Sequence, residues 1–214
     1  MFRKIFILTL LFGIYPGAIA ADQCSSPGHA VKPGIVKILG DNAIGSGVVI
    51  SNGHVLTAAH VIEGMQDISV MIRGKATAAR VISRDKRIDL ALLEVSTGDI
   101  TPLSVRRSQL KANAPVWTLG YPFGKRLKTG TGVYRRIHNG VIYTSAPVNF
   151  GQSGGGLISC ENGRHVLSGI IKAFGADYRD GKLVRRNDVS VATRTRDLKS
   201  FVTTSQQLAS LTRQ

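Results

Sequence analysis

The sequence predicts an all-β protein built as a sandwich or a barrel. Short runs rich in Val, Ile and Thr recur along residues 35–192, with turn dipeptides between them. Asn-Gly or Asp-Gly pairs, which tolerate positive φ and favour hairpins, occur at 52–53, 139–140, 162–163 and 180–181. No helical periodicity separates the runs, and this argues against a parallel α/β sheet.

The strands follow from the apolar runs and from the turns that bound them. In chain order, the predicted strands span residues 35–39, 44–50, 54–57, 68–72, 76–82, 89–95, 115–119, 129–135, 140–145, 155–160, 165–173 and 188–192.

Two helical pieces complete the prediction. One is a short turn after Ala58-Ala59-His60, and the other is a C-terminal helix from Thr195 to Leu211 with apolar Leu198, Val202, Leu208 and Leu211. Pro102 and Pro115 bracket a polar stretch, which predicts a seam between two β units. No repeat of fixed period accompanies these units.

Residues 1–20 have the pattern of a cleavable secretory signal peptide. Arg3 and Lys4 precede an apolar run of ten residues, and Ala18-Ile19-Ala20 is a small-x-small cleavage site. An uncleaved anchor is the alternative, but the run is shorter than the roughly 20 residues of a membrane-spanning helix. We therefore expect export and a mature N-terminus at Ala21, with no transmembrane segment after cleavage.

Cys24 and Cys160 are the two cysteines of the chain. Because an exported protein meets oxidising conditions, we expect them to form a disulfide that closes a loop of 136 residues. In an entropic model such a link contributes up to about 5 kcal/mol. Two free thiols, or pairing with a partner, are the alternatives.

The formal net charge is +15, or +13 without Arg3 and Lys4. The excess gathers in two clusters, which are Lys125, Arg126, Lys128, Arg135 and Arg136, and then Arg179, Lys182, Arg185 and Arg186. A field of this sign attracts acidic proteins, nucleic acid or anionic envelope polymers, although a solvated surface is the commoner meaning of such clusters. No aromatic interleaving accompanies the clusters, so specific nucleic-acid binding is not predicted.

The first chemical pattern is Thr57-Ala58-Ala59-His60, where two small residues end a strand before a histidine. Small side chains let the backbone pack closely behind the imidazole and fix its ring. A neutral imidazole is the usual base for taking a proton from a hydroxyl near neutral pH. Taken alone, such a histidine is more often a structural residue.

The second pattern is Ile88-Asp89-Leu90-Ala91-Leu92-Leu93, with one aspartate in an apolar run. Strand alternation puts Asp89, Ala91 and Leu93 on one face. A carboxylate buried there needs a partner. We expect Asp89 to orient a histidine; a solvated residue at the entry of a strand is the alternative.

The third pattern is Phe150-Gly151-Gln152-Ser153-Gly154-Gly155-Gly156, a serine in a glycine cluster before a strand. Glycines let the loop turn sharply and let a substrate carbonyl approach the backbone. The N–H groups of Gly151 and Ser153 are therefore candidates for an oxyanion hole. A flexible glycine turn with an incidental serine is the alternative.

Together the three patterns predict a catalytic triad. The order His60, Asp89, Ser153 is one of the known triad orders. The first two residues belong to the first β unit and the third to the second, so we expect the site in the cleft between them.

These motifs resemble the three signature blocks of trypsin-like serine peptidases. Gly45-Ser46-Gly47-Val48-Val49-Ile50, which leads through Asn52-Gly53 into His60, is similar to the bacterial HtrA/Deg branch. Over residues 34–202 the resemblance implies two antiparallel six-stranded β-barrels with a catalytic cleft between them. It implies hydrolysis of peptide bonds through an acyl-enzyme.

The signal-peptide pattern, the seam and the resemblance together divide the chain into a signal peptide (1–20), an N-terminal extension (21–33), a first barrel (34–112) and a second barrel with the helix (113–214). Two departures from the family bear on regulation. Gln152 stands where digestive trypsins have an aspartate, so activation by a new N-terminus is not expected. The sequence also shows no peptide-binding PDZ module after the helix, so regulation by one is not expected.

By resemblance, the specificity pocket lies between two short segments, Pro147-Val148-Asn149 and Lys172-Ala173-Phe174. No acidic residue stands at its base, so a preference for Lys or Arg is not predicted. Phe174 is expected to narrow the pocket in favour of small apolar side chains, and Lys172 to pair with an acidic group of the substrate. Ordinary strand packing is the alternative for all of them.

The sequence therefore predicts a serine endopeptidase of the bacterial periplasm or a secreted one, acting on protein or peptide substrates. The alternative is a catalytically silent protein of the same fold that binds an acidic partner or anionic surface through its basic loops. A structural envelope protein is a third possibility. No metal-ligand cluster or cofactor fingerprint is visible, because the remaining histidines are scattered.

Overall fold

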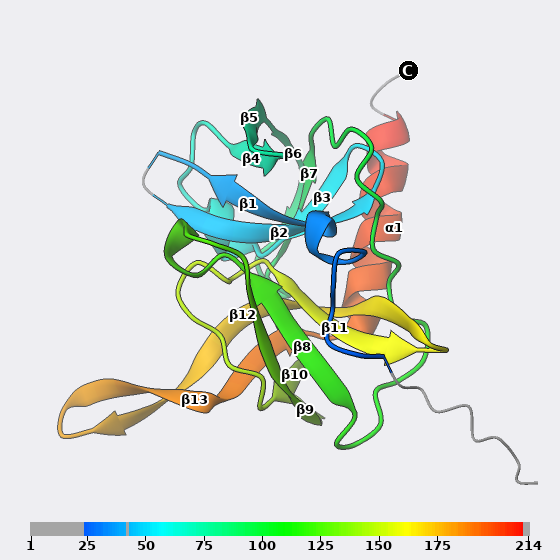
Figure 1. Cartoon of the computed structure of the whole chain (residues 1–214). Helices are drawn as coiled ribbons and strands as arrows, with labels where there is room; N and C mark the ends of the chain where they lie inside the picture. Colours follow the sequence, from blue (N-terminus) through cyan, green and yellow to red (C-terminus); the bar gives the residue numbers. More distant parts are fainter. Residues whose placement is uncertain (1–23, 42, 212–214) are drawn as a thin grey trace, which may run out of the picture.

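The computed structural model of the chain describes residues 24–41 and 43–211, with side chains to residue 207. Two β units lie one above the other, and a C-terminal helix runs beside both (Figure 1). This arrangement agrees with the predicted mostly-β chain of two units. The predicted signal peptide lies outside the described residues.

The first unit is one seven-stranded antiparallel sheet. Its strands are β1 (Ile35–Leu39), β2 (Ile44–Ser51), β3 (His54–Thr57), β4 (Ser69–Ile72), β5 (Lys75–Ala78), β6 (Arg80–Asp85) and β7 (Leu90–Glu94). Their order in the sheet is β5-β4-β1-β2-β3-β7-β6.

The prediction of a six-stranded first barrel is therefore wrong. The run expected as one strand over 76–82 is divided at Ala79, whose N–H donates to the Ile68 carbonyl at 2.9 Å. The run changes its partner at this point, since β5 pairs with β4 and β6 pairs with β7. Strands β5 and β6 are therefore the two edges of the seven-stranded sheet and follow each other in the chain through Ala79.

The second unit is a closed barrel of six strands, as predicted for this half. Its strands are β8 (Pro115–Gly120), β9 (Lys128–His138), β10 (Val141–Thr144), β11 (Gly156–Glu161), β12 (Arg164–Arg179) and β13 (Lys182–Thr193). The last two are much longer than predicted. They leave the barrel as a twisted hairpin that projects at the lower left of Figure 1 and turns at Asp180-Gly181.

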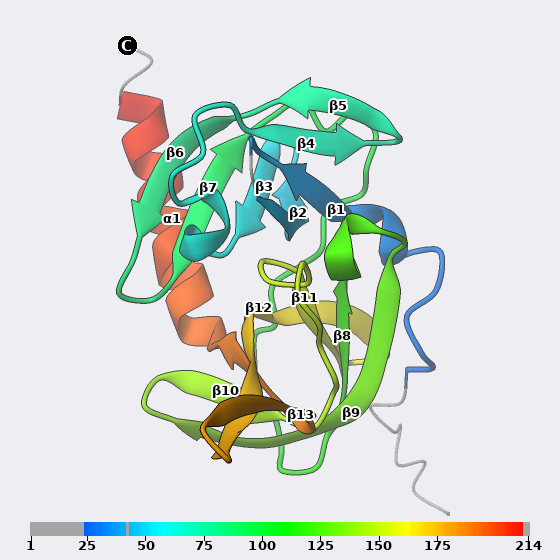
Figure 2. The same cartoon turned by 90° about the vertical axis from the view of Figure 1, so that its left-hand side faces the viewer.

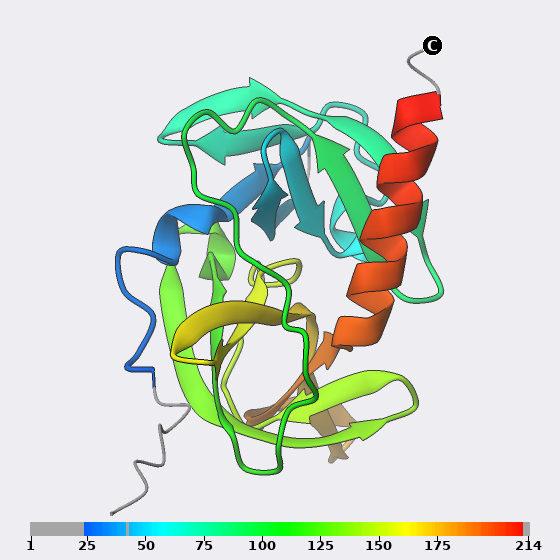
Figure 3. The same ribbon diagram turned by 90° about the vertical axis from the view of Figure 1, so that its right-hand side faces the viewer.

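The helical pieces match the predicted ranges. Helix α1 spans Thr195–Leu211, and one of three short 3-10 turns, η2 (Ala59–Ile62), carries the candidate histidine. The other two are η1 (Lys32–Gly34) and η3 (Pro122–Gly124). Figure 3 shows α1 running beside both β units. The side chains of Leu208 and Leu211, two predicted apolar positions, lie outside the described ones.

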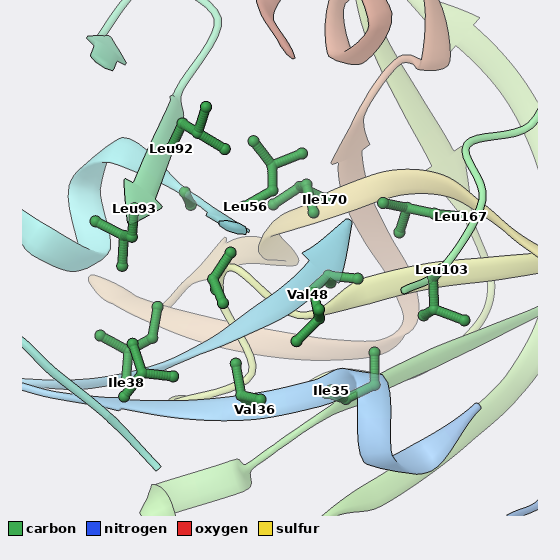
Figure 4. Close-up of a cluster of buried hydrophobic side chains, with 14 of the residues drawn as sticks. Ile35, Val36, Ile38, Val48, Leu56, Leu92, Leu93, Leu103, Leu167 and Ile170 are labelled. Carbon is green, nitrogen blue, oxygen red and sulfur yellow. The ribbon is translucent and has the colours of Figure 1, made fainter. Parts of the chain in front are cut away.

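One hydrophobic core joins the two units. Residues of the first sheet such as Val48 and Leu56 share a buried cluster with Leu167 and Ile170 of β12 (Figure 4). Leu198 and Phe201 of α1 belong to the same cluster, so the helix covers the junction. This shared core fixes the two units relative to each other, and therefore fixes the loops that meet between them.

The N-terminal end of the described chain is tied to the second barrel. Cys24 and Cys160 form a disulfide with a Cα–Cα distance of 5.5 Å. The connection between the units, residues 95–114, crosses back over the barrel, where Val105 forms a bridge with Leu167. The predicted division at 112–113 falls within this connection.

Candidate active site

His60 and Asp89 lie side by side at one end of the paired strands β3 and β7. The His60 ring Nδ1 is 3.0 Å from Oδ1 and 2.9 Å from Oδ2 of Asp89. The backbone N–H of His60 also donates to Oδ1 at 3.0 Å. Buried Ala58 and Ala59 bring this backbone against the sheet. One carboxylate therefore fixes both the ring and the main chain of the histidine.

The local structure of Asp89 differs from its prediction. Strand β7 begins at Leu90, and Asp89 has a φ of 59°, so it does not share a strand face with Ala91 and Leu93. The left-handed turn, which aspartate tolerates better than most residues, aims the carboxylate at η2 instead. The sequence pattern identified Asp89 as a candidate but did not predict its backbone conformation.

The electrostatics of Asp89 favour the ionised form. Burial raises the pKa of this carboxyl, since its side chain is only 15% exposed. Hydrogen bonds from the His60 ring and N–H, with the charges of His60 and Lys172, outweigh burial and hold the pKa below its usual value. An ionised Asp89 stabilises the Nδ1–H tautomer of His60, which leaves Nε2 free as a base.

Ser153 is presented by a loop of the second unit that reaches toward the first sheet (Figure 2). The N–H of Ser46 on β2 donates to the Ser153 carbonyl at 2.8 Å, and the Gly154 N–H donates to the Ile171 carbonyl at 2.8 Å. Gly154 has a φ of 82°, and a Cβ there would lie 2.1 Å from the Ser46 carbonyl oxygen. A close approach to β2 thus requires glycine after the serine.

The Ser153 hydroxyl donates to the Lys172 carbonyl at 3.1 Å. No hydrogen bond between this hydroxyl and His60 occurs in the part of the chain that the structure describes. Both residues line one cleft of about 410 Å³ between the two units. A serine–histidine hydrogen bond at such a site often forms only with substrate bound.

The loop before Ser153 is held in a defined orientation. The Phe150 carbonyl accepts from the Phe123 N–H at 2.7 Å, and the Gly151 carbonyl accepts from the Ser46 hydroxyl at 2.8 Å. A trans peptide points its C=O and N–H in opposite directions, so the Gly151 N–H points away from Phe123. Gly151 also lines the cleft that holds Ser153.

Ser46 is the site residue that sequence reasoning missed. It is fully buried, and its hydroxyl accepts from the Tyr121 N–H at 2.9 Å while donating to Gly151. In the sequence, its motif carries only the resemblance to the HtrA/Deg branch. The signal available in the sequence was a hydroxyl between two glycines on a buried strand, where a polar group requires a partner.

The predicted pocket residues fall into two places. Val148, Lys172, Ala173 and Phe174 line the cleft with His60 and Ser153, together with Asn149. Pro147 does not line it and instead borders a second cavity on the other side of the loop. Asn149 lines both spaces, so the segment 147–149 runs between the cleft and the second cavity.

Aromatic rings form one wall of the cleft. The Phe174 and Phe150 rings pack edge to face with 5.0 Å between their centroids. The guanidinium carbon of Arg185 lies 5.7 Å from the centroid of the Phe174 ring. The Lys172 ammonium donates to the Ile88 carbonyl at 3.4 Å, beside Asp89. This places the Lys172 charge near the His60–Asp89 pair.

Two arginines of the hairpin of β12 and β13 are paired with carboxylates. Arg179 pairs with Asp177 at 3.0 Å, and Arg186 pairs with Asp188 at 2.7 Å.

Within the described residues no group of His, Cys, Asp and Glu is arranged to hold a metal ion. None of the helices described there has the length and apolar character that a bilayer span requires.

Comparison with known proteins gives consistent results. The family model of the trypsin-like peptidase domain matches residues 45–170. A probable periplasmic DegP-like serine endoprotease of Pseudomonas fluorescens is 34% identical over 128 residues, covering 55% of this chain and 27% of that protein. The serine protease Rv3671c of Mycobacterium tuberculosis is 32% identical over 161 residues, covering 68% of this chain and 40% of that protein.

Solved structures share the fold. The inactive form of the Rv3671c protease superposes with a TM-score of 0.68 at 26% identity, covering 80% of this chain and 88% of the other. The HtrA-type protease AlgW with a tripeptide also gives a TM-score of 0.68 at 26% identity, covering 78% and 58%. The chain spans only about a quarter of the length of the DegP-like relatives.

Proposed function

This chain belongs to the trypsin-like peptidase domain family, and on that premise we propose that it is an exported serine endopeptidase with His60, Asp89 and Ser153 as its triad. The observation that carries the proposal is the contact of one ionised carboxylate with both the ring and the N–H of His60. Ser153 lines the same cleft.

In the proposed reaction, the Ser153 hydroxyl attacks the carbonyl carbon of the scissile peptide. His60 Nε2 takes the hydroxyl proton and then gives it to the leaving amine, while Asp89 stabilises the imidazolium that forms in between. Water attacks the resulting acyl-enzyme with His60 again acting as base. The Gly151 and Ser153 N–H groups are the proposed donors to the oxyanion, each contributing about 100- to 1,000-fold in rate.

The proposed substrates are peptide segments that enter the cleft between the units 34–112 and 113–214. We propose that Phe174 and Val148 limit the specificity pocket to small apolar side chains, because an aromatic ring occupies its wall. Relatives named as periplasmic serine endoproteases support export to the periplasm. Sequencing of the mature N-terminus tests the export step, with Ala21 as the expected first residue.

The central test is labelling of the purified protein with a fluorescent fluorophosphonate. We expect labelling of the natural protein, none of Ser153→Ala, and a strongly slowed reaction of Asp89→Asn, where the tautomer of His60 is no longer held. A folded natural protein that resists the reagent would contradict the proposal. The silent, partner-binding alternative predicts this negative result.

A further inference from the structure

A second cavity lies on the opposite side of the serine loop from the cleft. Its volume is about 680 Å³, within the range of sites that hold small molecules. Its apolar walls include Pro122, Phe123 and Pro147, and Gln152 borders it directly before the candidate nucleophile. A ligand in this cavity would therefore contact the loop that presents Ser153 without entering the cleft.

Three cations stand around the cavity, namely Lys125, Arg126 and Lys128. All three are exposed, and within the described part of the chain none forms an ion pair with a carboxylate. This sets them apart from Arg179 and Arg186 of the hairpin, which are paired. Unpaired cations beside apolar walls favour a ligand with both an anionic and an apolar part.

Gln152 supplies a hydrogen-bond donor to the same cavity. The residue is only 3% exposed, and its Oε1 accepts from the Asn149 N–H at 2.8 Å. No described residue accepts a hydrogen bond from its amide nitrogen, although the side chain lines the cavity. The nitrogen is not fully enclosed, so it can donate to an acceptor oxygen of a ligand in the cavity.

Phe123 links the cavity to the oxyanion loop. Its side chain lines the cavity, its N–H holds the Phe150 carbonyl, and its ring lies 6.3 Å from the Phe150 ring. The φ of Phe123 is 53°, a left-handed conformation that a bulky residue adopts only when its surroundings impose it. A ligand that contacts Phe123 in the cavity therefore acts on a strained residue that orients the Phe150–Gly151 peptide.

We propose that this cavity is an effector site for an apolar group that ends in a carboxylate. The carboxylate accepts from the Gln152 amide and from the cations, while the apolar group packs on Pro122, Phe123 and Pro147. Because such a ligand binds the conformation in which Phe123 holds the Phe150 carbonyl, it stabilises that conformation. The effect on catalysis rests on the proposed peptidase function, whereas the binding itself does not.

Either a free aliphatic acid or the C-terminus of a peptide carries this chemistry. The binding experiment uses folded Ser153→Ala protein in titration calorimetry, so that no probe is cleaved. One arm compares octanoate with octanol, and the other compares an acetylated dipeptide ending in a free leucine carboxylate with its C-terminal amide. We expect one of the two acids to bind and its neutral counterpart to bind at least about tenfold more weakly, a difference of about 1.4 kcal/mol.

A matched pair of triple variants locates the binding. Lys125→Gln/Arg126→Gln/Lys128→Gln removes the cations of the cavity, and Lys75→Gln/Lys111→Gln/Lys182→Gln removes three exposed, unpaired cations elsewhere. We expect the first set to weaken binding of the acid at least about tenfold and the second to leave it unchanged. Failure of both acids to bind, equal binding of the neutral probes, or equal effects of the two triple variants would overturn the proposal.

Activity is measured separately on the protein with Ser153 intact. The bound acid is expected to raise kcat/KM for a chromogenic peptide severalfold, and the cavity triple variant to lose this increase. An acid that binds in the cavity without changing kcat/KM overturns the effector role. If the acid binds but the fluorophosphonate does not label the protein, the peptidase function is overturned and the proposed binding site is supported. If the protein is labelled but no acid binds, the binding site is overturned and the peptidase function is supported.

Discussion

Ser46 shows how one hydroxyl connects the two β units at the candidate site. Ser46 lies on β2 of the first sheet, yet the two hydrogen-bond partners of its hydroxyl, the Tyr121 N–H and the Gly151 carbonyl, belong to the second unit. Its own N–H donates to the Ser153 carbonyl. Ser46 therefore positions both sides of the proposed oxyanion hole without touching the reacting atoms.

At the scale of single residues, we predict that Ser46→Ala lowers kcat and kcat/KM together by about 10- to 100-fold. The substitution leaves the Gly151 carbonyl and the Tyr121 N–H without their hydroxyl partner, and this frees the loop to leave its catalytic orientation. Steady-state kinetics and the rate of fluorophosphonate labelling check the result. Ser83→Ala on β6 is the control, and an equal loss in both variants would contradict a positioning role.

At the scale of elements, Glu161 anchors the connection between the units to the end of β11. It accepts from the N–H groups of Arg107 and Ser108 and from the Ser108 hydroxyl. Burial raises the pKa of Glu161, but these hydrogen bonds and the nearby Arg106 guanidinium lower it to about 2. The anchor is therefore a pH-dependent contribution to stability.

A folded-state pKa of about 2 against an ordinary value of 4.5 corresponds to about 3 kcal/mol, of which solvent screening leaves about 2. Because the pKa is lowered by folding, this stabilisation is complete above about pH 4.5 and is lost as the pH falls toward 2. Urea unfolding from pH 7 to pH 2 is expected to show Glu161→Gln approaching the natural protein at low pH.

Asp99→Asn is the control for this measurement. Asp99 forms an exposed ion pair with Arg73 at 2.7 Å, and such pairs contribute about 0–1 kcal/mol. A cost for Glu161→Gln that stays constant down to pH 2 would show that the carboxylate does not carry the anchor.

Helix α1 is the second element that holds the units together. Leu198 is fully buried in the shared core, and its neighbours in that core come from both β units. We predict that Leu198→Ala lowers the free energy of unfolding by about 2–5 kcal/mol, because it leaves a cavity at the junction. Thermal unfolding measures the loss, and exposed Thr203→Ala on the same helix is expected to stay within about 0.5 kcal/mol.

At the scale of the whole molecule, the disulfide ties the N-terminal segment to the far end of the second barrel. Cys160 lies near the end of β11, whereas the serine loop enters that strand at Gly156. A link of 136 residues in sequence restricts the unfolded chain strongly. The disulfide therefore contributes to the stability of the folded protein more than to the geometry of the cleft.

We predict that reduction lowers the free energy of unfolding by up to about 5 kcal/mol and leaves kcat/KM unchanged at temperatures where the protein stays folded. Calorimetry with and without a reductant checks the first part, and a peptide assay checks the second. The Cys24→Ser/Cys160→Ser protein is expected to match the reduced natural protein and to ignore the reductant. A loss of activity in the folded reduced protein would mean that the link supports the cleft.

Local residue patterns were enough to find the strands, the C-terminal helix and the motifs around His60, Asp89 and Ser153. Turn dipeptides and apolar runs are short-range signals. The small residues beside His60 and Ser153 are also local signals, because they directly follow or precede the residues that they position. The mostly-β class and the candidate triad therefore follow from the sequence alone.

Long-range contacts decided the rest. The predicted strand 76–82 changes its partner from β4 to β7 after Ala79, and the shared core set the spacing of the two units. The left-handed turn at Asp89, the hydroxyl of Ser46 and the cavity behind Gln152 depend on residues far apart in the chain. Tertiary structure alone determines these features, because each arises from a neighbour that no local pattern specifies.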